Sequence, residues 1–266
     1  MFYSDLILYM YRVILEYGII NQITFKGGYI MNDVLKFLYR NYLLHVDMIE
    51  CIKNQGYRII ESSNKGVLIT DKDNMVVMLS VIDINSKGDF ISKIPNEAKM
   101  IVAHQKFCAD YLKEIFNVVD EMNCYQSVYT KKAPLIIDND NVKIKRLNEE
   151  YAEFVFNNYS SKDTADIDYI IDRIKSNTML GAFVDEKLVG FIGTHEEGAI
   201  GILEVLPHYR NRGIGEKLQR CATNLALEQD RIPYGQVKIN NIKSIRLQKR
   251  LGFEISEDIV YWLMID

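Results

Sequence analysis

The chain of 266 residues has 32 Lys and Arg against 36 Asp and Glu, a net charge of −4, and 48% hydrophobic residues. This length is enough for one large domain or two modest ones. The acidic balance argues against nucleic acid as the main partner, because phosphate binding needs a basic face. It leaves room for a local basic patch around a phosphate-bearing cofactor.

The first 30 residues form a separate question. Phe2–Ile23 is apolar, but three charged residues interrupt it, which fits neither a signal peptide nor a membrane span. We therefore expect no membrane partner and a cytoplasmic location. Lys26–Met31 reads like a translated ribosome-binding site before a start codon, so our hypothesis is that residues 1–30 are a mis-annotated or poorly ordered extension. An ordinary extra helix is the alternative.

The four cysteines give no sign of a metal site. Cys51, Cys108, Cys124 and Cys221 stand in no CxxC or Cys/His ligand spacing. With no secretory signal in view, reduced thiols are expected. We predict no bound metal.

Residues 31–132 predict an N-terminal α/β domain. Apolar spacing indicates a helix over Asn32–Gln55 and another over Gln105–Met122. The predicted strands have alternating or short apolar runs bounded by turns; they are Tyr57–Glu61, Gly66–Thr70, Met75–Ile82, Lys99–Ala103 and Tyr125–Thr130. Residues 133–141, with a proline and an acidic turn, are the predicted linker.

Residues 142–266 predict a second domain of β-α-α-β-β-β-α-β-α-β order. Its expected elements are strands at 142–147, 179–185, 188–194, 200–206, 234–239 and 253–265, and helices at 149–158, 165–176, 213–229 and 242–251. The fold class is therefore α/β (α+β) in both domains.

The chemically informative stretch joins the strand ending at Leu206 to the helix beginning at Gly213. A helix start offers unpaired backbone N–H groups and the positive end of a dipole, which suit an anion. Gly213 and Gly215 have no side chain to keep a phosphate away, and Arg210 and Arg212 add positive charge. These features predict a diphosphate site.

Two common diphosphate motifs do not fit these residues. A P-loop needs Lys and Ser or Thr after the last glycine, whereas Gly215 is followed by Glu216-Lys217-Leu218. A dinucleotide fingerprint needs a third glycine where Leu218 stands. Both are excluded.

The pattern that does fit is Val205-x-Pro207 followed by Arg210-x-x-Gly213-x-Gly215. It resembles the coenzyme A loop of the GCN5-related N-acetyltransferase (GNAT) family. Asn241-x-x-Ser244 and Leu251-Gly252-Phe253 resemble two further motifs of that family, in the same order. The stretch Gly201–Arg210 is similar to the FR47-like and glycine N-acyltransferase branch. The resemblance covers about residues 141–266.

The resemblance implies a mixed, mostly antiparallel sheet flanked by helices, with acetyl-CoA as the acyl donor substrate. It implies that the strands at 200–206 and 234–239 splay apart around the pantetheine arm, held by main-chain groups near Leu203 and Val205. The diphosphate would lie on the backbone of the loop and helix start, and Asn241 would touch the cofactor edge. The implied loop residues are Arg210, Asn211, Arg212, Gly213, Ile214, Gly215 and Glu216.

Transfer to an amine needs the neutral amine, yet typical amines are protonated at pH 7, so a base helps. Glu204 is the candidate catalytic base, and a solvent-facing strand residue is the alternative. His195 and Glu196, in the preceding turn with Glu197, are candidate substrate-binding residues or ordinary hairpin charges. Many family members have a tyrosine as acid where this chain has Gln248, which cannot supply a proton.

The predicted function is N-acetyl transfer from acetyl-CoA to a primary amine of a small molecule or amino acid. Two alternatives stay open: protein N-termini or lysines as acceptors, and a non-catalytic acyl-CoA-binding module. The first domain resembles a degenerate GNAT-like half, whose equivalent loop His104–Ala109 has no glycine. We therefore expect one cofactor site, and leave open an unrelated first domain and a homodimer.

Overall fold

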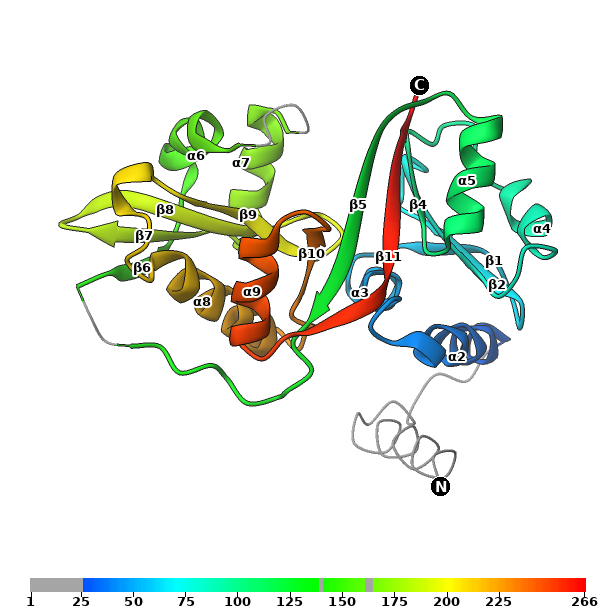
Figure 1. The fold of residues 1–266 in the computed structure, drawn as a ribbon, viewed down its shortest axis with the longest axis horizontal. Coiled ribbons are helices and arrows are strands. Elements are labelled where there is room, and N and C mark those ends of the chain that lie inside the picture. The colour runs from blue at the N-terminus through cyan, green and yellow to red at the C-terminus, as the bar shows by residue number, and fades with distance from the viewer. Residues whose placement is uncertain (1–25, 139–140, 161–164) are drawn as a thin grey trace.

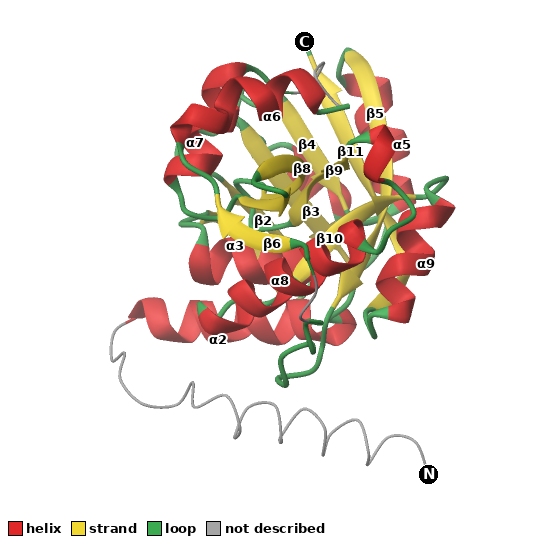
Figure 2. Ribbon diagram, turned by 90° about the vertical axis from the view of Figure 1, so that its left-hand side faces the viewer, coloured by secondary structure: helices red, strands yellow, loops and turns green. Residues whose placement is uncertain are grey.

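The structure is a computed structural model that describes residues 26–138, 141–160 and 165–266. The chain forms two lobes with two long strands, β5 and β11, standing between them (Figure 1). Figure 2 shows the strands inside the molecule with the helices around them. We call residues 26–128 the first half and residues 143–265 the second half.

The first half contains four α-helices and five strands among the described residues. They are α2 (Lys26–Leu38), α3 (Val46–Asn54), β1 (Arg58–Ser63), β2 (Gly66–Thr70), β3 (Val76–Val81), α4 (Lys87–Ile91), β4 (Met100–Ala103), α5 (Lys106–Ile115) and β5 (Val118–Val128).

The second half contains four α-helices and six strands in the part that the structure describes. They are β6 (Lys143–Arg146), α6 (Ala152–Asn158), α7 (Ile167–Lys175), β7 (Leu180–Val184), β8 (Lys187–Thr194), β9 (Ile200–Val205), α8 (Ile214–Glu228), β10 (Tyr234–Lys238), α9 (Ile242–Arg250) and β11 (Glu254–Ile265).

Both halves contribute to one seven-stranded sheet. Its order is β1-β2-β3-β4-β11-β5-β10, and a second sheet has the order β6-β7-β8-β9. The last strand of the second half therefore stands between two strands of the first half, and β5 stands between β11 and β10. The division at residues 133–141 stays a prediction, but in this fold neither half completes its sheet without the other.

The two halves repeat one element order. After β6, the series α6, α7, β7, β8, β9, α8, β10, α9, β11 matches α2, α3, β1, β2, β3, α4, β4, α5, β5 element by element. The mixed α/β fold is thus confirmed, and the first half repeats the element order of the second. The correspondence between elements of the two halves differs from the one predicted from the sequence. Helix α4 corresponds to α8, whereas the sequence predicts that the helix after His104 does so. The loop that corresponds to the cofactor loop is therefore residues 82–86.

The predicted helix over Asn32–Gln55 is wrong as a single element. The chain turns between α2 and α3, where the side chain of Asn41 accepts a hydrogen bond from the Leu44 N–H at 3.4 Å. The helix also begins before Asn32, at Lys26. The hypothesis about residues 1–30 falls mostly outside the described residues.

The predicted helix over Gln105–Met122 is too long. Helix α5 ends at Ile115, Phe116 is extended, and β5 begins at Val118. Residues 118–122 pair with β11 from Ile265 back to Trp262. This pairing joins segments more than 100 residues apart, which outweighs the local helical spacing.

The sheet β6–β9 is covered on both faces, and this fixes the two sides of the site. One apolar cluster packs α8 on it, including Ile214, Leu218 and Ala222, and the other packs α6 and α7, including Val155 and Ile170. Within the described residues, no helix is both long enough and apolar enough to cross a membrane.

Candidate active site

The candidate site lies where β9 and β10 separate. The two strands belong to different sheets, as the resemblance implies. They still meet at one end, because a Cβ on Gly235 would lie 2.7 Å from the carbonyl oxygen of Ile200. The corresponding strands of the first half, β3 and β4, are instead joined by a parallel ladder. Only the second half therefore has an open strand edge at this position in the described fold.

Main-chain groups of Leu203 and Val205 point to this open edge. The N–H of Leu206 donates to Val189 on β8 at 2.9 Å, so residues 203 and 205, which alternate with it, face the other way. One of these groups already has a partner, since Arg210 Nε donates to the carbonyl of Val205 at 2.8 Å. The others are placed to bind an extended ligand.

A bulge in β9 sets which side chains face which side. Ile202 has a φ of 52°, and the pairing with β8 shifts between Phe191 and Gly193. Ile202 packs with the α6–α7 cluster, whereas Leu203 packs with α8. Because one residue is inserted, Glu204 turns to the α6–α7 side instead of the α8 side.

The loop before α8 exposes a series of backbone donors. Gly213 precedes the first residue of α8 with a φ of 77°, and Asn211 has a φ of 61°. In the described part of the chain, the N–H groups from Asn211 to Glu216 have no hydrogen-bond partner. A Cβ on Gly213 would meet nothing within 4 Å. A Cβ on Gly215 would meet only the Cγ2 atom of Val205, at 3.7 Å. The backbone here is open to an anion, as the glycines predict.

The charged side chains of the loop have other contacts. Arg210 lies with Nη2 3.9 Å from a Glu204 oxygen, and Arg212 lies over the Tyr209 ring at 5.4 Å. Glu216 accepts hydrogen bonds from Arg220 at 2.7 Å and Arg250 at 2.6 Å, which lower the pKa of its carboxyl. Two arginines thus compensate the one acidic side chain beside the anion site.

Asn241 and Gln248 have structural positions that the motif did not specify. The side chain of Asn241 caps α9 by accepting the Ser244 N–H at 3.1 Å. Gln248 is buried, and its amide oxygen has no hydrogen-bond partner. The Asn-x-x-Ser motif therefore starts the helix, and contact between Asn241 and a cofactor stays a prediction.

Glu204 lies beside the connection between α6 and α7. Its Oε1 accepts the N–H of Ser160 at 3.1 Å, and its side chain is 16% exposed. The carboxylate is thus oriented by a backbone donor while part of it reaches solvent. This arrangement suits a general base better than the solvent-facing alternative.

His195 is held inside the second half. Its Nδ1 lies 2.6 Å from the Tyr169 hydroxyl, and its Nε2 lies so close to where a Cβ on Gly201 would be that a larger residue at 201 would displace the ring. Burial lowers the pKa of His195 to about 4, so the ring is neutral at pH 7. Glu196 is exposed and lies 3.7 Å from Arg173. The structure therefore separates these two predicted substrate residues.

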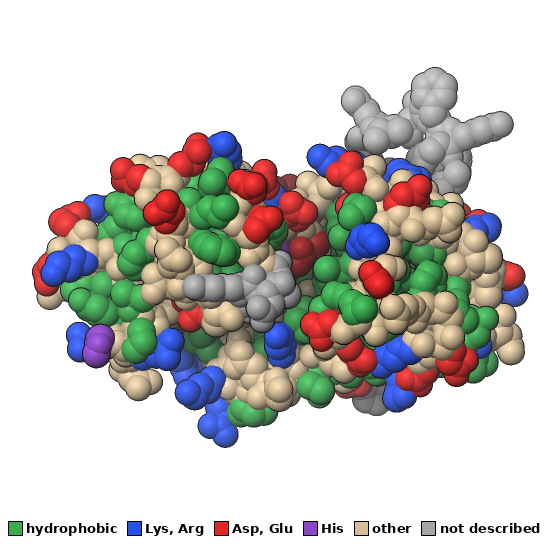
Figure 3. Space-filling view, turned by 90° about the horizontal axis from the view of Figure 1, so that it is seen from above, with side chains coloured by type: hydrophobic (Ala, Val, Ile, Leu, Met, Phe, Trp, Pro, Cys, Tyr) green, Lys and Arg blue, Asp and Glu red, His purple; other side chains and the backbone are tan. Residues whose placement is uncertain are grey.

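Glu197 has an unusual environment in the same turn. Burial raises the pKa of its carboxyl to about 7, with Asp47 and Glu196 adding repulsion. Its backbone oxygen accepts a hydrogen bond from the Tyr234 hydroxyl at 2.7 Å, which links the turn to β10. Figure 3 shows a hollow between the lobes with acidic side chains inside it.

The structure thus brings the loop 211–216, the edge of β9 and Glu204 to one place. Sequence reasoning missed Ser160 and Tyr169, which hold Glu204 and His195. Neither belongs to a motif, and both act through contacts with residues at least 26 positions away. Only the fold could reveal them.

Comparison with known proteins agrees with this geometry. Residues 143–253 match the model of the family described as "Acetyltransferase (GNAT) family". No curated protein matches the chain.

Three similar solved structures come from different organisms. A Drosophila protein is 17% identical, with a TM-score of 0.66, and the match covers 99% of this chain and 96% of that one. A GCN5-related N-acetyltransferase from Kribbella flavida is 12% identical, with a TM-score of 0.55 and coverage of 84% and 95%. A conserved protein of unknown function from Staphylococcus epidermidis is 12% identical, with a TM-score of 0.52 and coverage of 80% and 96%.

At these identities the structural matches show a shared fold alone, whereas the family model covers the residues that build the site. Residues 143–253 therefore match an acetyltransferase domain of the GNAT family, and the protein is an acyltransferase with a fold whose members use acyl-CoA as the donor.

Proposed function

We propose that the protein transfers an acetyl group from acetyl-CoA to a primary amine of a small molecule or amino acid, by direct attack of the amine. The observation that carries the proposal is the adjacency of three features: open N–H groups at 211–216, an unpaired edge of β9, and the Glu204 carboxylate on the other face of that strand. The stretch Gly201–Arg210 supports placement in the FR47-like branch.

The donor would be held mainly by the main chain. The N–H groups of residues 211–216 and the positive end of α8 would bind the diphosphate, with Arg212 adding charge. The free main-chain groups of Leu203 and Val205 would bind the pantetheine arm. The donor supplies the activated acyl thioester.

Glu204 would take the proton of the amine, directly or through water. Arg210 lies 3.9 Å from this carboxylate and places a positive charge beside it. A positioned base of this kind is worth about 10²- to 10⁴-fold in rate. Gln248 supplies no acid, but a thiol with a pKa near ~8.5 leaves as the thiolate.

The acceptor would enter from the α6–α7 side. Glu196 and Glu197 lie in the turn before β9, and acidic side chains occupy the hollow between the lobes (Figure 3). Negative potential attracts a protonated amine and raises its local concentration. Arg173, close to Glu196, would bind a carboxylate if the acceptor is an amino acid.

The test is an acetyl-CoA assay of thiol release with a panel of small amines, amino acids and a peptide with a free N-terminus. Glu204→Gln should lower kcat by about 10²- to 10⁴-fold and leave acetyl-CoA affinity unchanged. Glu228→Gln, an exposed glutamate at the end of α8, is the matched control and should have no effect.

Two results would contradict the proposal. Full activity of Glu204→Gln would reject this residue as the base. Tight acetyl-CoA binding without turnover of any amine would favour the acyl-CoA-binding module, which Gln248 makes the second candidate.

A further inference from the structure

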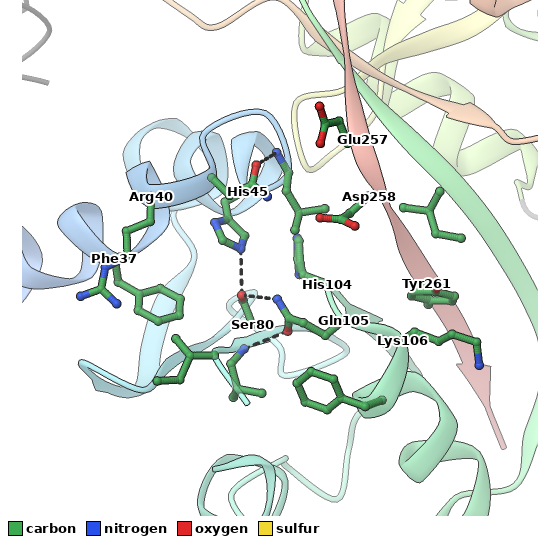
Figure 4. A pocket seen from close by; sticks show the side chains of 16 residues that line it. Phe37, Arg40, His45, Ser80, His104, Gln105, Lys106, Glu257, Asp258 and Tyr261 are labelled. Atoms are coloured by element: carbon green, nitrogen blue, oxygen red, sulfur yellow. Dashed lines mark hydrogen bonds between the residues drawn. The ribbon is translucent and has the colours of Figure 1, made fainter. Parts of the chain in front are cut away.

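The first half and β11 together line a cavity of about 530 Å³ that the proposed acetyl-transfer site does not use. It lies where β3 and β4 end, between the α2–α3 connection and the middle of β11 (Figure 4). Aromatic side chains form much of its wall, namely Phe37, Phe107 and Tyr261.

In the repeat, this cavity corresponds to the place of acyl transfer in the second half. Ser80 is the penultimate residue of β3, as Glu204 is of β9. Ser160, after α6, contacts Glu204; His45, after α2, contacts Ser80. Because the ladder between β3 and β4 closes the donor cleft here, this position can bind a ligand but has no place for acyl-CoA.

The floor of the cavity is polar and held in one arrangement. His45 Nδ1 donates to the Leu38 carbonyl at 2.9 Å, so Nε2 accepts from the Ser80 hydroxyl at 2.8 Å. Ser80 in turn accepts from Gln105 Nε2 at 2.9 Å, and Figure 4 shows both partners pointing at Ser80. Burial lowers the pKa of His45 to about 4, so the ring is neutral. One amide hydrogen of Gln105 and one lone pair of Ser80 remain for a ligand.

The rim of the cavity carries charges of both signs. Glu257 and Asp258 are exposed, and neither carboxylate has a hydrogen bond or ion pair with another described residue. Arg40 donates only to the Asn64 carbonyl, so no described carboxylate neutralises it, whereas Lys106 is paired with Asp110 at 2.6 Å. The rim charges without an opposite charge among the described residues are thus two carboxylates and one guanidinium, which lies over the Phe37 ring at 5.3 Å.

These features fit a small zwitterion with an apolar side chain. Its ammonium group would lie at Glu257 and Asp258, its carboxylate at Arg40, which binds carboxylates through two parallel N–H groups, and its side chain against the aromatic wall. A volume of about 530 Å³ is within the range of small-molecule sites.

The cavity is connected to the transfer site through α3. His104 lines the cavity, and its Nε2 lies 2.9 Å from an Asp47 oxygen on α3. The other Asp47 oxygen accepts from Gln236 on β10 at 3.4 Å. Glu50 lies three residues after Asp47 on α3, and its carboxylate accepts a hydrogen bond from Arg231, which comes just before β10.

We propose that this cavity is a regulatory site for a free α-amino acid with an apolar side chain, and that its occupancy changes acetyl-CoA affinity through α3 and β10. A ligand that restricts the motion of α3 would also change the position of β10, because α3 contacts β10 through Asp47 and Gln236. Strand β10 is one wall of the proposed donor cleft. By linkage, acetyl-CoA must change the amino-acid affinity by the same factor.

The test is calorimetry on the full chain with apolar amino acids, each compared with its decarboxylated amine and its deaminated acid. The zwitterion should bind at least about tenfold more tightly than either analogue. Glu257→Gln/Asp258→Asn should weaken binding by about ten- to a hundredfold, because charged hydrogen bonds are lost. Glu228→Gln/Asp230→Asn removes two exposed carboxylates at the end of α8 and just after it, and should change nothing.

Coupling is measured by titrating acetyl-CoA with and without saturating amino acid; a shift of about five- to 150-fold is expected. Absence of amino-acid binding, or binding unchanged in the Glu257/Asp258 variant, would overturn the site. Unchanged acetyl-CoA affinity would overturn the regulation. Because these readouts need no turnover, a protein that acetylates no amine could still pass them, which separates this inference from the proposed function.

Discussion

The carbonyl oxygen of Ile200 on β9 and the Cα of Gly235 on β10 lie in such close contact that a Cβ at residue 235 would be 2.7 Å from that oxygen. This contact is the closed end of the proposed donor cleft. It sets the distance between the two strands at this end.

Gly235→Ala should therefore push β10 away from β9. We expect a loss of about 1–3 kcal/mol in the free energy of unfolding and weaker acetyl-CoA binding, because backbone atoms must shift. Urea unfolding and calorimetry measure the two effects. Gly88→Ala is the control, since its Cβ would meet nothing within 4 Å; equal behaviour of both variants would contradict the role of the contact.

Alanine substitutions at Gly213 and Gly215 distinguish the effect of backbone strain on stability from the effect of an added side chain on ligand binding. Gly213→Ala places a side chain at a φ of 77° and should cost about 1–2 kcal/mol of stability. Gly215→Ala has room, with a nearest contact of 3.7 Å, so stability should hardly change. Both added methyl groups stand beside the open N–H groups and should weaken acetyl-CoA binding in calorimetry. Unaltered affinity in both variants would show that the diphosphate binds elsewhere.

Glu197 should make stability depend on pH. Its pKa is raised from 4.5 to about 7, so between these values the native state keeps a proton that the unfolded state has lost. Stability attributable to this group therefore falls as the pH rises from about 4.5 to 7, and the full cost is present above pH 7.

Glu197→Gln removes that cost. The Tm of the variant relative to the parent should be higher at pH 8 than at pH 5, as measured by thermal unfolding in matched buffers. Glu196→Gln, whose side chain is 63% exposed, should show no such difference. A Tm difference independent of pH would contradict the buried position of the Glu197 carboxyl.

The buried pair Glu50–Arg231 should be a major contact between the halves. The side chains are 0% and 12% exposed, and the Nε–Oε1 distance is 2.8 Å. Glu50→Ala leaves the arginine buried without its partner and should cost about 3–5 kcal/mol, seen as a lower urea midpoint. Asp33→Ala, which breaks an exposed pair with Lys36, should change stability by less than about 1 kcal/mol.

Much of the second half was predictable because its signals are local. Gly213 before α8, the Asn241 cap and the apolar face of α8 all depend on residues within a few positions of one another. Both strands of the donor cleft, β9 and β10, were also predicted close to their observed limits.

The errors concern features that depend on distant partners. Residues 118–122 have helical spacing but become strand because β11 pairs with them. The side of β9 on which Glu204 lies depends on the bulge at Ile202. The sequence of that strand does not predict a positive φ at an isoleucine. The contact of Ser160 with Glu204 likewise needs the folded arrangement of α6 beside β9.

The exchange of β5 and β11 has a consequence for how the protein is made. While a ribosome is still translating, β4 and β5 have no strand to fill the place between them, since β11 begins 136 residues after β5 begins, at residue 254 against residue 118. The facing edges of β4 and β5 thus stay unpaired from residue 118 to residue 254, which is about half of the synthesis of the chain. A nascent chain of this kind is expected to depend on holding chaperones, and its folding should be completed in a single late step when β11 inserts.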